Sequence, residues 1–195
     1  MRIHYSISLI LVTLMAWTVS PAHAQKTEYQ VDKDAKNKVT FISDAPVEDF
    51  EGVTGNIDGY LLHTGDELAE GSKLYFEVDL RTLDTGIGLR NRHMREDYLH
   101  TDKYPYAKFS GRVDKTWKGA NGPEARVVGT MEIHGKKKEL SLKGVLTPSG
   151  EGMRVRSTFE VKLTDHGIEV PQFMFMKISE VMKLVLDFQL KRIKG

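Results

Sequence analysis

Apolar and polar residues alternate with a period of two along most of the chain. In the segment KLYFEVDLRTL, the side chains of Leu74, Phe76 and Val78 would share one face of a strand, and the polar residues between them the other. This alternation is typical of a β-strand with one buried face. The pattern predicts about eight strands, near residues 38–42, 55–62, 74–80, 107–113, 127–133, 140–146, 155–163 and 182–190.

Short polar segments that contain glycine separate many of these strands. They lie at residues 70–72, 119–123, 134–136 and 148–152. Turns of this composition join antiparallel strands. Many strands with short turns predict an all-β fold, either a sandwich or an eight-stranded antiparallel barrel. Closing the sheet removes its exposed edges, and a barrel of this size either fills with side chains or holds one small ligand.

Residues 88–99 interrupt the alternation. Good helix formers accumulate there, and Met94 and Tyr98 are four residues apart, as neighbours on one helix face would be. The segment predicts a short helical insert of one or two turns between strands.

The first 24 residues have the three parts of a secretory signal peptide. Arg2 gives the positive start, residues 7–17 form an apolar stretch, and the Ala-His-Ala sequence at 22–24 is a cleavage site. The apolar stretch is shorter than the roughly 20 residues that a spanning helix needs. We therefore expect cleavage after Ala24, export to the periplasm, and a single soluble domain over residues 25–195.

Charge and cysteine content narrow the function classes. Of the 28 basic residues only Arg2 lies in the signal, so the mature part would carry equal numbers of basic and acidic side chains. A neutral domain offers no broad footprint for nucleic acid, and the basic turn at 136–138 has no interleaved aromatic residues. The chain has no cysteine, which excludes disulfides, thiolate nucleophiles and cysteine metal sites.

Several motifs occur in a recognisable order. They are Tyr-x-Val-Asp at 29–32, Arg-x-x-His-x-Arg at 90–95, Lys-Tyr-Pro at 103–105 with Ala-x-Phe at 107–109, Ile-His-Gly at 133–135 and Asp-His-Gly-Ile at 165–168. This arrangement resembles the YceI-like family, although Asn91 follows Arg90 where that family usually has Asp. The resemblance implies a lipocalin-like barrel, exported to the periplasm, that carries a polyisoprenoid or related amphiphilic lipid in its lumen without catalysis.

The inward faces of the predicted strands supply candidate residues for the ligand tail. These are Phe76, Val78, Phe109, Met131, Phe159, Val161, Leu184, Leu186 and Phe188. The small inward residues Ala107, Gly111, Gly129 and Ser157 would leave volume in a lumen, or would instead accommodate large neighbours in a filled core. Burying ten methylenes of a tail would contribute on the order of 8 kcal/mol before association costs.

The helical insert supplies a candidate clamp for an anionic head group. Arg92 and Arg95 are three residues apart on one side of a helix, and Arg90 and His93 are likewise three apart on a neighbouring side. Guanidinium groups donate to phosphate or carboxylate oxygens in pairs. The alternative is a structural lid, in which the acidic residues at 96 and 97 neutralise the arginines.

Two further alternatives remain open. The first is a metal-dependent or hydrolytic enzyme that uses His93, His100, His134 and His166. Because no His-x-His or His-x-x-x-His spacing and no nucleophile motif occurs, we expect no catalytic residue, no metal and no cofactor, and we expect His134 and His166 to bond the backbone in turns. The second is a partner-binding scaffold beside membrane redox or quinone machinery.

The apolar run at 173–176, Phe-Met-Phe-Met, bears on the second alternative. It would form a rim for partner binding or a transient membrane contact, unless the helical insert covers it. The expected assembly is a monomer or a homodimer.

Overall fold

A computed structural model describes residues 26–44, 49–64, 68–120, 122–170, 172–173 and 176–194. The predicted signal peptide lies outside these residues. The strands are β1 (Lys26–Val31), β2 (Lys38–Ser43), β3 (Phe50–Thr54), β4 (Ile57–Thr64), β5 (Lys73–Asp79), β6 (Tyr106–Gly119), β7 (Gly122–Ile133), β8 (Lys136–Ser149), β9 (Gly152–Lys162), β10 (Gln172–Phe173), β11 (Met176–Lys177) and β12 (Val181–Lys194). The helical segments are η1 (Leu80–Thr82), α1 (Gly88–His93), η2 (Met94–Tyr98) and η3 (Leu163–His166).

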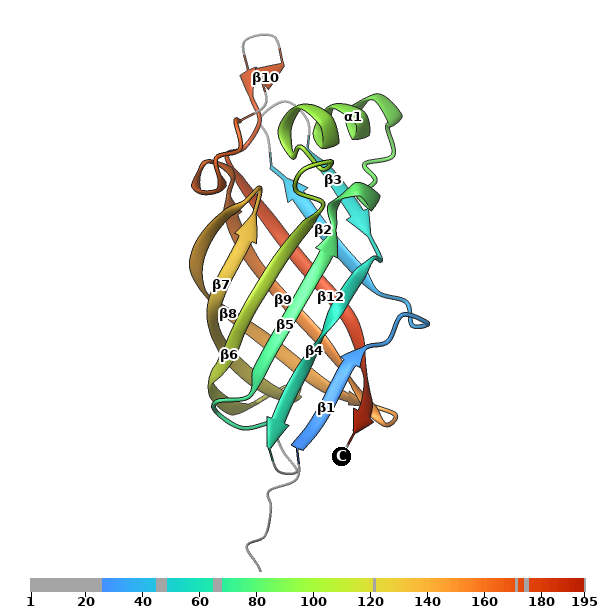
Figure 1. The fold of residues 1–195 in the computed structure, drawn as a ribbon, viewed down its shortest axis with the longest axis vertical. Coiled ribbons are helices and arrows are strands. Elements are labelled where there is room, and N and C mark those ends of the chain that lie inside the picture. The colour runs from blue at the N-terminus through green and yellow to red at the C-terminus, as the bar shows by residue number, and fades with distance from the viewer. Residues whose placement is uncertain are drawn as a thin grey trace, which may run out of the picture.

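Eight strands close into an antiparallel barrel, which is one of the two all-β folds that the alternation allowed and the one that the family resemblance implied (Figure 1). They follow the order β1, β4, β5, β6, β7, β8, β9, β12, and β12 pairs back onto β1. The ring contains every predicted strand except β2. Its remaining member, β1, was not predicted, because this short strand alternates weakly and its register with β12 shifts between Glu28 and Tyr29.

The strands β2 and β3 extend the wall beyond this ring. One edge of β12 is shared, since its residues 182–187 pair with β2 and its residues 190–194 pair with β1. At the far side of the β2–β3 hairpin, the backbones of Val53 and Asp84 exchange hydrogen bonds of 2.8 and 2.9 Å. The hydroxyls of Thr54 and Thr82 lie 2.6 Å apart beside them. This seam joins β3 to the segment after η1.

The helical insert covers the end of the barrel near β3, here called the upper end (Figure 1). The α-helical turn α1 passes directly into η2, a π-helical turn in which the Leu99 amide donates to the Met94 carbonyl. The prediction of a short helical insert at residues 88–99 is therefore confirmed. Among the described residues, no helix is long and apolar enough to cross a membrane.

The lower half of the barrel is packed with side chains. Leu190, Phe188 and Val113 are at most 2% exposed and come from β12 and β6. Their positions follow the two-residue alternation, which turns every second side chain of a strand inward. These side chains leave only a small hollow in the lower half, and the larger hollow of the barrel lies beneath the helical insert.

Candidate ligand-binding cavity

A cavity of about 560 Å³, the upper chamber, occupies the barrel beneath α1 and η2. Its walls include eight of the nine residues predicted for a ligand tail: Phe76, Val78, Phe109, Met131, Phe159, Val161, Leu184 and Leu186. Other lining residues were not predicted. Leu83, Ile87 and Leu89 belong to irregular or helical chain without a period-two pattern, whereas Phe41 lies on an inward position of β2 that the alternation contains. The lining is almost entirely hydrocarbon, which suits an apolar ligand.

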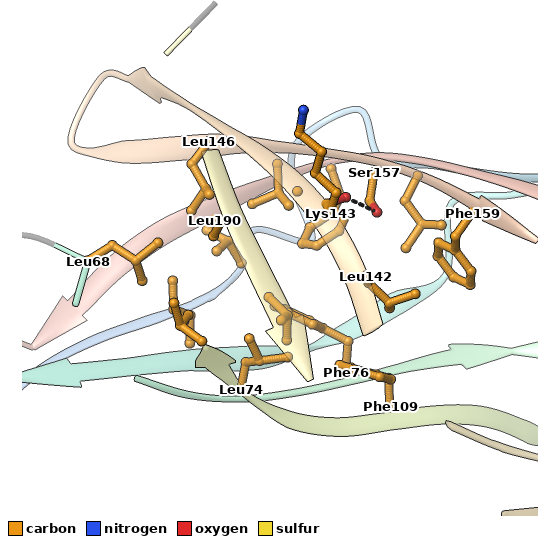
Figure 2. A pocket seen from close by; sticks show the side chains of 18 of the residues that line it. Leu68, Leu74, Phe76, Phe109, Leu142, Lys143, Leu146, Ser157, Phe159 and Leu190 are labelled. Carbon is orange, nitrogen blue, oxygen red and sulfur yellow. Dashed lines mark hydrogen bonds between the residues drawn. The ribbon is translucent and has the colours of Figure 1, made fainter. Parts of the chain in front are cut away.

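A second cavity of about 110 Å³, the lower chamber, lies deeper in the barrel (Figure 2). The ninth predicted residue, Phe188, lines this space. The hydroxyl of Ser157 donates to the Lys143 carbonyl at 2.7 Å, which satisfies a polar group at its wall. The Lys143 ammonium pairs with Glu124 at 2.5 Å on the outer surface and therefore lies outside the lower chamber. The lining of the lower chamber is apolar as well.

Five side chains line both chambers and form the layer between them: Phe76, Phe109, Met131, Phe159 and Leu186. Phe76 on β5 meets Phe188 on β12 edge to face, with ring centroids 5.0 Å apart, although these strands are not neighbours in the ring. The contact therefore crosses the lumen. We call this layer, together with Phe188, the aromatic partition.

Small residues make room for the rings of the partition. A Cβ added at Gly111 would lie 2.6 Å from the Val128 carbonyl oxygen, one added at Gly129 would lie 2.3 Å from the Ser110 carbonyl oxygen, and either would lie 3.0 Å from the Phe109 ring. Neither glycine lines a chamber. At these two positions the small residue accommodates a large neighbour, which is the second of the two alternatives that the sequence left open. Ala107 and Ser157 do line chambers, the upper and the lower one respectively.

Two of the four predicted head-group residues, Arg90 and His93, line the roof of the upper chamber. The Arg90 guanidinium donates from Nε to the Thr85 hydroxyl at 3.1 Å and from one terminal nitrogen to the Thr85 carbonyl at 3.0 Å. Its carbon lies 4.7 Å from the centroid of the Phe50 ring. These contacts hold a cationic group at the edge of an apolar space.

The other two arginines do not reach the upper chamber. Arg92 is exposed, and Arg95 donates to the Leu83 carbonyl at 2.6 Å while its Nε is buried without a hydrogen-bond partner. No ion pair joins Arg92 or Arg95 to Glu96 or Asp97, all four of which are described. Arg95 therefore ties η2 to the chain before α1, while Arg92 faces solvent.

Asn91 fixes the loop that leads into α1. Its side-chain carbonyl accepts from the Thr85 amide at 2.8 Å, and its amide nitrogen donates to the Asp84 carboxylate at 2.7 Å. The bond from Asn91, helped by the Gly86 backbone amide, lowers the pKa of Asp84. An Asp in place of Asn91, as the resemblance would have it, would put two carboxylates in contact here.

The histidines bond mainly to backbone and to one another. As expected for turn residues, a ring nitrogen of His166 contacts the Lys136 carbonyl at 3.1 Å, and one of His134 contacts the His166 carbonyl at 3.3 Å. His100 Nδ1 lies 2.8 Å from His134 Nε2. The sequence did not indicate this pair, because the two residues are far apart in the chain. Within the described ranges, no three His, Asp or Glu side chains gather as metal ligands would.

The predicted rim at residues 173–176 falls largely outside the described residues. The backbones of β10 and β11 pair through Phe173 and Met176. The side chains of this run lie outside the description, so its role as a rim stays a prediction.

Comparison with known proteins gives the chain its relatives. A UPF0312 protein of Pseudomonas aeruginosa is 26% identical over 173 residues, which cover 84% of this chain and 87% of that protein. A UPF0312 protein of Photorhabdus laumondii is 30% identical over 101 residues, which cover 51% of this chain and 50% of the relative.

Solved structures share the fold. BcnA of Burkholderia cenocepacia superimposes with a TM-score of 0.65 at 18% identity, covering 82% of this chain and 98% of its own. A polyisoprenoid binding domain from Saccharophagus degradans superimposes with a TM-score of 0.62 at 17% identity, covering 85% and 98%. The YceI-like domain matches residues 29–190, and with it the barrel, the helical insert and both chambers. The chain therefore belongs to the YceI-like family.

Proposed function

We propose that this protein binds an amphiphilic lipid, with the apolar tail in the upper chamber and the head group at the roof beside Arg90 and His93. The observation that carries the proposal is a cavity of about 560 Å³ whose walls are apolar and whose roof bears a cationic side chain. The structural relative from Saccharophagus degradans is described as a polyisoprenoid binding domain, which supports an isoprenoid or similar chain as the ligand.

The proposed activity is carriage rather than catalysis. Transfer of each methylene from water into such a cavity contributes about 0.8 kcal/mol, so a long tail is held without a reaction or a specific hydrogen bond. The head group needs only a cationic partner at the roof, which Arg90 provides. Export to the periplasm, proposed from the first 24 residues, would place such a carrier between two membranes.

A variant that fills the upper chamber tests the proposal. The full chain is expressed with its leader, purified from the periplasm without detergent, and examined by native mass spectrometry and lipid extraction. We expect the wild type to carry an extractable amphiphile and Leu184→Trp, which adds bulk to the upper chamber, to carry much less. Val185→Trp is the matched control, because Val185 lies on the same strand, lines neither chamber and should leave the lipid content unchanged.

Three outcomes would each overturn a different part of the proposal. Wild-type protein without any hydrophobic ligand, both as purified and after incubation with prenyl lipids, would exclude lipid carriage. Equal lipid content in the wild type and a folded Leu184→Trp variant would place the lipid outside the barrel. Recovery of the protein in the cytoplasm with its first 24 residues intact would contradict export.

A further inference from the structure

We infer that the aromatic partition sets the length of the tail that this protein accepts, so that the tail ends at Phe76 and Phe188 and does not enter the lower chamber. The inference rests on the proposed function and specifies its ligand. It follows from three features of the barrel interior: the division of the lumen into two chambers, the contact that crosses it, and the glycines that seat its rings.

The volumes of the chambers give the tail its size. A cavity of about 150 Å³ accommodates one benzene ring, so by the same measure the upper chamber has room for about 20 carbon atoms. That is about four isoprene units or one long acyl chain. The lower chamber, at about 110 Å³, has room for about four more carbon atoms. A tail longer than the upper chamber must therefore displace the partition or leave its end in water.

The partition is built to stay in place. Phe188 is 2% exposed and Phe109 is 7% exposed, so both rings are buried inside the barrel. The Phe109 ring lies against Gly111 and Gly129, and a Cβ at Gly59 would lie 2.7 Å from the Phe76 ring. Rotation of either ring would break its contact with the strand that carries the glycine. A packed interior resists such a displacement because every shifted ring opens a cavity elsewhere.

A competition among tails of different length tests the inference. The protein is freed of lipid in denaturant, refolded, and incubated with an equimolar mixture of straight-chain primary alcohols of about 12 to about 26 carbons. Each added methylene raises the affinity about fourfold as long as it is buried. Bound alcohols are extracted and measured by gas chromatography. We expect the wild type to enrich alcohols up to about 20 carbons and to gain nothing from longer ones.

Variants on each side of the partition separate its effect from a general loosening of the core. Phe76→Ala joins the two chambers. Because the lower chamber has room for about four carbon atoms, the length of the enriched alcohols should rise by about four carbons or more. Leu146→Ala enlarges the lower chamber alone and should leave the enriched length unchanged. Ala107→Leu fills part of the upper chamber and should shift the enriched length down.

The results distinguish the inference from the function on which it rests. A wild type that enriches alcohols without a length limit, or a folded Phe76→Ala variant with the wild-type limit, overturns the partition as a ruler while leaving lumen binding intact. A wild type that retains no alcohol of any length overturns lumen binding itself. Should Phe76→Ala fail to fold, Leu146→Ala still decides the question, because enlarging the lower chamber raises the length limit only if the tail passes the partition.

Discussion

His100 Nδ1 and His134 Nε2 are hydrogen-bonded at 2.8 Å, so one ring donates and the other accepts. The contact joins the loop after η2 to the β7–β8 turn, and the Tyr104 ring packs edge-on against His134 at a centroid distance of 4.7 Å. A proton on both rings would set two positive charges in contact. The pair therefore links the helical insert to the barrel only while at least one ring is neutral.

This link makes the fold sensitive to mild acid. Burial lowers the pKa of His134 below its ordinary 6.5, and His100, Lys103 and Lys136 act in the same direction against a hydrogen bond to His166. The unfolded chain takes up this proton at a higher pH than the folded chain does. The contribution of neutral His134 to the free energy of unfolding is therefore fully present above about pH 6.5 and is lost as the pH falls toward the lower pKa of the folded state. Urea unfolding at a series of pH values measures the loss.

The variant His134→Asn checks the assignment. Asn tolerates the left-handed backbone of this position, where φ is 52°, and its side chain does not titrate. We expect it to be less sensitive than the wild type to pH below about 6.5. Parallel stability curves for the two proteins would contradict a role for His134.

The same turn depends on Gly135. With φ values of 52° and 70°, His134 and Gly135 form the two-residue turn that matches the twist of a hairpin. In Gly135→Ala a Cβ would lie 2.7 Å from the Tyr104 ring, so we expect a loss of about 2 kcal/mol in the free energy of unfolding, measured by denaturant titration.

Gly150→Ala is the control, since Gly150 has φ of 58° but open space around it, and should lose only about 1 kcal/mol. Equal losses in the two variants would show that the Tyr104 contact costs nothing.

Arg95 holds the helical insert down. Its bond of 2.6 Å to the Leu83 carbonyl is a charged hydrogen bond at a 5%-exposed residue, and such bonds are worth about 1.5–3 kcal/mol. In Arg95→Ala we expect faster amide hydrogen exchange in α1 and η2, with little change in β6 to β9. Arg92→Ala should leave exchange unchanged, because Arg92 is exposed. Similar exchange in both variants would remove Arg95 from this role.

An ion pair on the outer wall stabilises the barrel at neutral pH. Burial alone would raise the pKa of Asp187, but hydrogen bonds from Arg154 and Arg156 outweigh it and lower the pKa. The contribution is present above about pH 3.8 and is lost as the pH falls through the folded value.

Asp187→Asn should therefore cost about 1 kcal/mol at neutral pH, a value reduced for a carboxylate that is one-third exposed, and nothing near pH 2. Asp58→Asn, in a pair with Lys33 that is mostly exposed, should cost close to zero at either pH. A cost for Asp187→Asn that persists in acid would point to packing instead of charge.

The period-two alternation predicted most of the strands and of their inward residues because a strand turns every second side chain to the same face. It could not predict how far those side chains reach. Phe76 and Phe188 are both inward by sequence, yet only the closed ring brings them together across the lumen. The division into two chambers therefore depends on distances between strands that no local pattern contains.

The orientation of the arginines shows a second limit. A regular helix places residues three apart on one side, but α1 ends at His93 and continues as a π-helical turn, whose wider spacing rotates the residues that follow. Arg90 and His93, both within α1, share the roof of the upper chamber as their spacing predicted. Arg95, in η2, is turned away toward Leu83.

Because β1 and β2 share one edge of β12, the wall closes in a different way at each end of the barrel. The lower end is a closed ring, in which each strand pairs with its neighbours on both sides through backbone hydrogen bonds. At the upper end, the wall closes beside β3 through a seam that consists of the Val53–Asp84 backbone pair and the Thr54–Thr82 hydroxyls. Fewer hydrogen bonds would therefore have to break to part the wall at this seam, beside the larger cavity, than between any two neighbouring strands of the lower ring.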